Sequence, residues 1–135
     1  MKYICLGYTD EKWWDEHSED ERNDFIDKCF TYDDTLRRDG HFAGGEALQS
    51  SKNAITLGWR DGSVITTDGP YAETKEQIGG IMILEAADLN DAVRLISNHP
   101  SLRFGNSHWE IRPAADLTAM MEESNNRQAT TTRRR

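Results

Sequence analysis

The chain has 135 residues, of which 36% are hydrophobic and 30% are charged, with a formal net charge of -8 at pH 7. A chain of this length and composition suits one globular domain with its own core, rather than a disordered or fibrous protein. The acidic balance argues against a nucleic-acid partner, because phosphates require a basic surface.

No apolar run approaches the roughly 18 to 20 residues that cross a bilayer, and the first residues lack the length and cleavage site of a signal peptide. We therefore expect a cytoplasmic protein with no membrane partner. The two cysteines, Cys5 and Cys29, have no Cys-x-x-Cys spacing and are interpreted as reduced core residues. The four histidines show no metal-ligand spacing, so neither a metal site nor a cofactor is predicted.

Residues 2 to 8, KYICLGY, are rich in strand-forming residues and predict a buried first strand. The segment from Thr9 to His17 is expected to be a loop and carries Trp13 and Trp14. Two adjacent tryptophans cannot share one face of a helix or strand. At least one of them should therefore cover a neighbouring element, a partner subunit or the mouth of a pocket.

Ser18 and Glu21 have the spacing of a capping box, and apolar residues recur every three or four positions after them. This pattern predicts a long amphipathic helix with an acidic exposed face that ends at Gly40. Residues 41 to 48, HFAGGEAL, predict a second strand. Its Gly44-Gly45 pair indicates a bulge or a close approach by another group, because glycines leave room beside the backbone.

Two short runs at 54 to 59 and 63 to 67 favour strands, and the segment that joins them contains Asp61-Gly62. Asp-Gly between such runs is a strong signal for a hairpin. A two-residue turn would place Trp59 opposite Val64 and Leu57 opposite Thr66.

Residues 80 to 87, GIMILEAA, are apolar on both faces and predict a central strand that is covered on each side. Asp88 is expected to cap a second helix, which ends at His99-Pro100. The predicted buried stripe of that helix is Leu89, Ala92, Val93 and Ile96. A loop to Asn106 then leads into a last strand over Ser107 to Pro113.

The predicted domain covers residues 1 to 116, and the polar segment 117 to 135 is expected to be mostly disordered. The predicted fold is α+β, a ferredoxin-like βαββαβ unit with an inserted β-hairpin. In such a unit both helices lie on one face of the antiparallel sheet. Because the central strand is apolar on its other face too, we expect a homodimer packed sheet to sheet.

The segment 67 to 80, TDGPYAETKEQIGG, combines a rigid Gly-Pro turn with charged residues and two glycines. Asp68 or Glu76 could act as a general base, with Lys75 as the partner of an anionic substrate. Alternatively, Asp68 only stabilises the turn by accepting hydrogen bonds. His108, on a strand face with other polar residues, could supply a further acid or base.

This segment resembles the motif of the DGPF domain proteins, within the YCII-related group, with Tyr71 where the Phe of that name stands. The likeness extends to RRDGHFAGGEAL at 37 to 48 and WEIRP at 109 to 113. The resemblance implies a dimeric α+β barrel built on the ferredoxin-like unit. Relatives that share this barrel include small-molecule isomerases, monooxygenases and heme-dependent enzymes.

In the YCII-related group a His and Asp pair is suggested as catalytic. Asp68 matches the motif, whereas the histidine nearest to the first predicted helix is His17, which lies just before it. Members of the group are often encoded beside, or fused to, sigma factors of the extracytoplasmic-function class. The resemblance therefore also implies a link to such a sigma factor.

We expect a small-molecule site between the segment from Asp68 to Gly80 and the strand from Gly44 to Leu48, with Trp13 or Trp14 as its cover. Acid/base chemistry there would use Asp68, Lys75 and Glu76. The predicted pocket-lining residues are Tyr71, Glu46, Trp13 and His108. Two rival interpretations are a non-catalytic regulatory or protein-interaction module and a dimeric scaffold in which the motif is only a turn.

Overall fold

The computed structural model describes residues 1–104 and 107–134 of the chain. The strands are β1 (Lys2–Asp10), β2 (Phe42–Ala47), β3 (Ile55–Arg60), β4 (Ser63–Asp68), β5 (Glu76–Glu85) and β6 (His108–Pro113). The helices are α1 (Glu11–Glu16), α2 (Glu19–Arg38), α3 (Leu89–Ser97) and α4 (Leu117–Arg134), with short 3₁₀ helices η1 (Ser51–Asn53) and η2 (Pro100–Arg103). The predicted loop to Asn106 and the predicted tail to Arg135 extend beyond the described residues.

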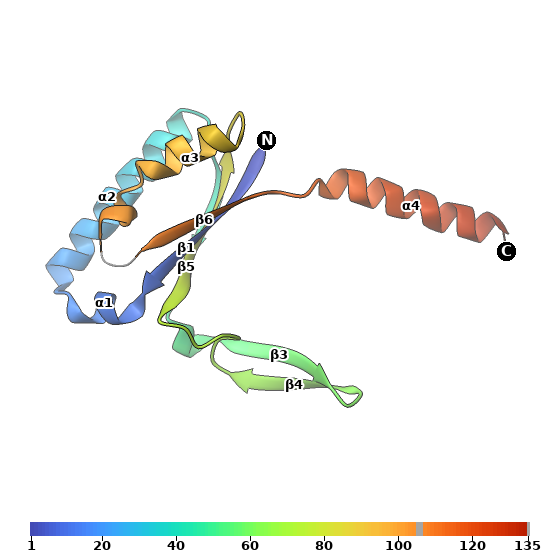
Figure 1. The fold of residues 1–135 in the computed structure, drawn as a ribbon, viewed down its shortest axis with the longest axis horizontal. Helices are drawn as coiled ribbons and strands as arrows, with labels where there is room; N and C mark the ends of the chain where they lie inside the picture. Colours follow the sequence, from blue (N-terminus) through green and yellow to red (C-terminus); the bar gives the residue numbers. More distant parts are fainter. Residues whose placement is uncertain (105–106, 135) are drawn as a thin grey trace.

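The main sheet has the strand order β2-β5-β1-β6, and each neighbouring pair is antiparallel. Strands β3 and β4 form a separate two-stranded sheet. Figure 1 shows α2 and α3 on one face of the main sheet, whereas the β3–β4 hairpin and α4 project away from it. The α+β class predicted from the sequence is therefore confirmed.

The hydrophobic core lies between the main sheet and these two helices. Tyr3 and Cys5 of β1 pair in register with Leu84 and Met82 of β5, so all four side chains point to the same face of the sheet. They pack against Leu36 of α2 and against three residues of α3. The three α3 residues are Ala92, Leu95 and Ile96.

Helix α2 begins with the predicted capping box. The Ser18 hydroxyl accepts a hydrogen bond from the Glu21 backbone N–H, and the Glu21 carboxylate accepts one from the Ser18 backbone N–H. The helix is tied to α3 by the Tyr32 hydroxyl, which donates to the Leu95 carbonyl. Although α2 has an apolar stripe, only Leu36 is fully buried on it. Tyr32 also packs against the core, whereas the other apolar residues of the stripe line a cavity: Phe25, Ile26, Cys29 and Phe30.

The hairpin forms in the predicted register, with Trp59 opposite Val64 and Leu57 opposite Thr66. Its turn residues Asp61 and Gly62 have φ values of 51° and 81°. Two consecutive positive φ angles are those of a type I′ turn, the geometry that Asp-Gly favours. The apolar side chains of β3 remain exposed, and Trp59 keeps 72% of its accessible surface.

Helices α1 and α3 differ from the sequence-based expectations. Residues 11 to 16 form α1 instead of a loop, because the Asp10 carboxylate caps the helix by accepting from the Lys12 backbone N–H. In α3, Leu89 and Val93 were predicted to be buried but are exposed, and Leu95 takes their place in the core. Apolar spacing alone does not decide which of two overlapping stripes on a short helix faces the sheet.

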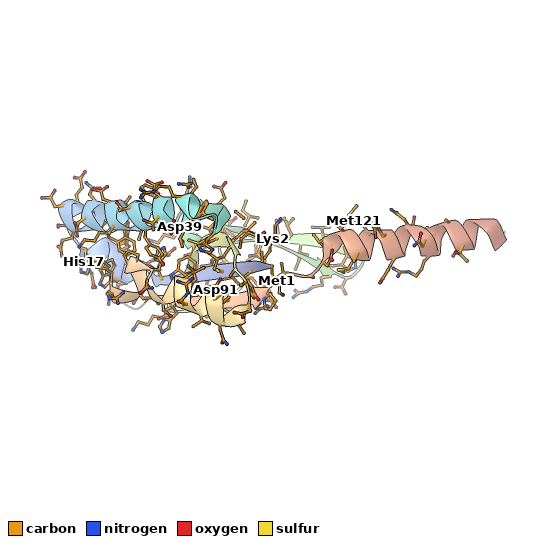
Figure 2. The ribbon with its side chains drawn as sticks, turned by 90° about the horizontal axis from the view of Figure 1, so that it is seen from above. Met1, Lys2, His17, Asp39, Asp91 and Met121 are labelled. Carbon is orange, nitrogen blue, oxygen red and sulfur yellow. The ribbon has the colours of Figure 1, made fainter. Side chains whose placement is uncertain are left out.

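Residues 117 to 134, for which the polar composition predicted mostly disorder, form α4. The Asp116 carboxylate accepts from the Ala119 backbone N–H at the start of the helix, and the Met, Glu, Gln and Arg residues that follow favour helix. Figure 2 shows this helix, labelled at Met121, extending well beyond the sheet. Among the described residues, no helix has the length and apolarity needed to span a membrane.

Candidate functional site

A cavity of about 1160 Å³ lies between α2 and the β2–β5 side of the main sheet. Phe25, Cys29 and Asp33 of α2 form one wall, and the opposite wall includes Gly45 and Gly80 of the sheet. Helix α1 contributes Trp13 and Trp14. The volume slightly exceeds the range of about 300 to 1,000 Å³ that is usual for small-molecule pockets.

Glycines on the sheet create part of this space. Gly45, Gly79 and Gly80 line the cavity without side chains. At Gly45 a Cβ atom would come within 3.0 Å of the Phe42 ring and 3.1 Å of the Ile81 carbonyl oxygen, so a larger residue would have to displace its neighbours by a few tenths of an ångström. The sequence-based expectation of close approach at the Gly44-Gly45 pair is confirmed for Gly45.

The cavity is rich in aromatic rings. These are Trp13, Trp14, Phe25, Phe30, Phe42 and Trp109. The Phe25 ring meets the Trp13 and Trp14 rings edge to face, with centroid separations of 6.0 and 5.9 Å. The two adjacent tryptophans therefore cover the same phenylalanine from α1, and they close one end of the cavity.

A pair of polar side chains, one buried and one partly buried, lies beside the cavity. Asp33 of α2 and His99, just before η2, approach each other with 3.6 Å between Asp33 Oδ1 and His99 Nε2. This separation is slightly too long for a hydrogen bond, and Asp33 Oδ1 is buried with no hydrogen-bond partner among the described residues. The Asp33 side chain as a whole is 20% exposed and lines the cavity. Its accessible part can therefore meet a ligand.

The orientation of His99 is fixed from its other side. The Ser101 backbone N–H donates to His99 Nδ1 over 3.2 Å, and the Ser101 hydroxyl lies 2.7 Å from the same nitrogen. Because a backbone N–H cannot accept, Nδ1 is the acceptor, and the neutral ring carries its proton on Nε2, which faces Asp33. Trp109 Nε1–H donates to the Ser101 hydroxyl oxygen over 2.7 Å, which leaves the hydroxyl proton free to point to Nδ1.

Two further groups near Asp33 are held in their neutral forms. Burial raises the pKa of the Cys29 thiol to about 11, and the charge of Asp33 adds to this rise. Burial also raises the pKa of Tyr32; Asp33 adds to that shift and Arg94 opposes it. Cys29 is therefore a protonated wall of the cavity and a poor nucleophile.

The residues predicted from the sequence are spread over three places. Trp13 and Glu46, two of the predicted pocket-lining residues, lie in the wall of the large cavity. Lys75 lines a second hollow of about 510 Å³ beside η1. Glu76 and His108 form an ion pair, with 3.0 Å between Glu76 Oε2 and His108 Nδ1.

Two more predicted residues lie outside the large cavity. Asp68 ends β4 on the hairpin and is exposed, and Tyr71 keeps 93% of its accessible surface. The sequence-based interpretation did not single out Asp33 or Ser101, and it used His99 only to end a helix. The signal in the sequence was a histidine directly before a proline, together with an aspartate on the predicted helix.

The architecture and the cavity together define a class, an α+β protein with a small-molecule-sized cavity between helices and sheet. Residues 1–117 match the YCII-related domain. Because this match covers most of the chain, the protein belongs to the YCII-related family, in agreement with the resemblance seen in the sequence. An uncharacterised protein of Rhizobium meliloti (strain 1021) is 28% identical over 115 residues, which cover 85% of this chain and 93% of the relative.

Proposed function

We propose that the large cavity binds a small, mostly apolar metabolite and that Asp33 acts as a general base on it. The observation that carries this proposal is a carboxylate on the cavity wall with one oxygen sealed and lacking a hydrogen bond. A buried carboxylate costs free energy unless it is compensated. Proteins tolerate this loss of folding free energy mainly at functional sites, where the carboxylate is used.

The geometry suits a reversible proton transfer. The accessible part of Asp33 takes a proton from the bound ligand, while the Nε2–H of His99 lies 3.6 Å from the other carboxylate oxygen. His99 thus positions the carboxylate and stabilises its charge, and Ser101 and Trp109 hold His99 in place. Return of the proton to a neighbouring atom of the ligand would complete an isomerisation.

The test combines a screen with a measurement of exchange. A thermal-shift screen of small metabolites finds ligands that stabilise the wild-type chain, and NMR then follows deuterium uptake from heavy water into a saturating bound ligand. Asp33→Asn should reduce the exchange rate by about a hundredfold or more. Asp27→Asn, on the exposed face of the same helix, is the matched control and should leave the rate unchanged.

A second variant tests the cavity itself. A Cβ atom at Gly80 would meet the Glu46 carbonyl oxygen at an ordinary 3.5 Å, so Gly80→Ala should fold, and Gly80→Val, with its fold checked by a melting curve, should reduce the space further. Ligands that stabilise the wild type should then fail to stabilise Gly80→Val. Equal stabilisation of both proteins, or exchange that survives in Asp33→Asn, would refute the proposed site.

We also propose that the chain is a ferredoxin-like unit that forms a homodimeric α+β barrel. The strand order β2-β5-β1-β6 with both helices on one face supports this arrangement. The other face presents Ile4, Leu6, Ile81 and Ile83, which register places side by side. The face of a second copy is a suitable cover for this apolar surface.

The alternative function is a non-catalytic module that binds a partner protein, for which the family resemblance suggests an extracytoplasmic-function sigma factor. The exposed apolar side chains of the hairpin, including Trp59, favour this alternative. The acidic face of α2 would suit a basic partner. Binding through that face should weaken steeply with added salt, whereas ligand binding in the cavity should be nearly insensitive to it.

A further inference from the structure

We propose that the ligand of the large cavity is an organic cation, an amine attached to an aromatic or similarly flat apolar group. This inference rests on the proposed function, because it names the class of molecule that Asp33 meets. The sequence had suggested the opposite, an anionic substrate held by Lys75. Lys75 lies beside the second hollow instead. The charged side chains around the large cavity are mostly negative.

Carboxylates outnumber cationic side chains in the lining of the cavity. The six acidic residues are Asp10, Glu11, Asp15, Asp33, Asp34 and Glu46, and the two basic residues are Arg37 and Lys52. An anionic ligand would enter against this field, whereas a cationic ligand would be drawn in.

The two cationic side chains that could neutralise these carboxylates are either paired already or exposed at the surface. Arg37 is bound to Asp34, with 2.5 Å between Nη1 and Oδ1, and its guanidinium lies over the Phe42 ring at 4.6 Å. Lys52 is exposed and makes no ion pair within the described part of the chain. Among the described lining residues, Lys52 is therefore the one cation left unpaired, and it is exposed rather than enclosed beside Asp33.

Several of the acids are also satisfied by the protein. Asp10 caps α1, and both carboxylate oxygens of Glu11 accept hydrogen bonds from Ser51, at 2.6 and 2.7 Å. Asp33 differs, because its sealed oxygen has no hydrogen-bond donor among the described residues and His99 Nε2 stays 3.6 Å away. An ammonium group at the accessible part of this carboxylate would supply charge and N–H donors together.

The aromatic rings that line the cavity also favour a positively charged ligand. The face of an aromatic ring attracts a cation, most strongly when water is excluded. Rings of this protein already do so, since Arg22 lies 5.8 Å from the Trp14 ring and Arg37 lies over Phe42. Phe25, Phe30 and Trp109 have no such partner among the described residues and line the cavity with Asp33.

The test uses three probes that share a phenyl ring and differ in their end group: 2-phenylethylamine, 2-phenylethanol and 3-phenylpropanoate. Isothermal titration calorimetry measures their affinities for the full chain. We expect the amine to bind about tenfold to a hundredfold more tightly than the alcohol, the range of a hydrogen bond to a charged group. The propanoate should bind more weakly than the alcohol.

Variants of Asp33 identify the group responsible. Asp33→Asn should remove the preference for the amine and leave the affinity for the alcohol within about twofold. Asp33→Glu keeps the charge and should retain the preference, and Asp27→Asn is the control for a general loss of negative charge. Melting curves confirm that each variant is folded before its affinities are compared.

Opposite results would overturn the inference. These are a propanoate that binds as tightly as the amine, a preference for the amine that survives Asp33→Asn, or no binding of any of the three probes. The proposed function is judged separately by the deuterium exchange of its own ligand. If exchange depends on Asp33 while the preferred ligands are anions, the base stands and the inference about ligand charge fails.

Discussion

Trp109 is the end of a hydrogen-bond chain that runs through Ser101 to His99 and faces Asp33. Its ring lies on Gly7, where an added Cβ atom would come within 3.0 Å of the indole. Four parts of the chain, β1, α2, η2 and β6, therefore meet around one imidazole. The Trp109 indole N–H holds the Ser101 hydroxyl that, with the Ser101 backbone N–H, orients this imidazole.

Trp109→Phe keeps an aromatic ring but removes this donor. We expect it to lower the free energy of unfolding by about 1 kcal/mol more than a Trp→Phe change elsewhere in the cavity, because a hydrogen bond is lost as well as volume. Trp14→Phe is the matched control, since the Trp14 indole N–H has no hydrogen-bond partner within the described residues. Urea denaturation measures both variants, and equal losses would contradict the role of the bond.

Cys29 offers a chemical probe of the cavity. Burial raises the pKa of its thiol to about 11, and only the thiolate reacts with iodoacetamide. Its alkylation should be slow at pH 7.5 and should accelerate about tenfold for each pH unit up to pH 9.5, since the thiolate fraction rises in that proportion. Cys29→Ser shows the contribution of Cys5, and a rate already at its plateau at pH 8 would contradict this prediction.

The sequence predicted part of the site and missed its centre for a physical reason. Trp13 could be recognised because adjacent tryptophans need a second surface to cover, and Glu46 because it follows a glycine pair. Asp33 looks like any other acid of an acidic helix, and His99 looks like a helix terminator. Their meeting depends on how α2 and η2 pack on the sheet, which local spacing does not encode.

At the scale of helices and strands, the sequence predicted correctly those elements that are determined by interactions between residues close together in the chain. The capping box at Ser18 and the Asp61-Gly62 turn each satisfy backbone groups within a few residues, so α2 and the hairpin appeared where expected. Helix α1 depends on a single cap from Asp10. Residues 117 to 134 became α4 although they are polar and include poor helix formers such as Asn125, Asn126 and Thr131.

The capping box also makes the stability of α2 depend on pH. The backbone hydrogen bond from Ser18, followed by the side-chain bond from Ser18, lowers the pKa of Glu21 below its usual 4.5. A group whose pKa is lower in the folded state stabilises the fold above its unfolded pKa, and this contribution is lost as the pH falls through the folded value. Glutamine can cap the same N–H but does not titrate.

Glu21→Gln should therefore be less stable than wild type at pH 6.5, and the difference should shrink by pH 3.5. Urea midpoints at the two pH values measure it. Glu19→Gln, in the same first turn but outside the capping box, is the control and should show a smaller change with pH. A difference between wild type and Glu21→Gln that stays constant would contradict the role of this carboxylate.

At the scale of the whole molecule, the proposed homodimer can be tested by a substitution on the sheet face that would be buried between the two copies. Ile81 lies on the sheet face opposite the helices and is 36% exposed, so a lysine there should be tolerated by a lone protomer. It should disrupt sheet-to-sheet packing, because a charge would be buried without a partner. We expect wild type to sediment as a dimer and Ile81→Lys as a monomer.

Leu89→Lys is the control for this experiment. Leu89 is 47% exposed on α3, on the helix side of the sheet, and its replacement should leave the dimer intact. Analytical ultracentrifugation over a range of concentrations measures all three proteins. A wild-type monomer at tens of micromolar, or a dimeric Ile81→Lys, would rule out the proposed interface.

Helix α4 and the packed domain should respond differently to heat. It projects beyond the sheet (Figure 1), and its apolar residues Leu117, Met120 and Met121 are exposed. A helix without tertiary packing is marginal in water and unwinds gradually, whereas a packed core melts cooperatively. Far-ultraviolet ellipticity should therefore decline on mild warming while the near-ultraviolet signal of the tryptophans stays constant. The end of the chain would melt long before the cavity loses its shape.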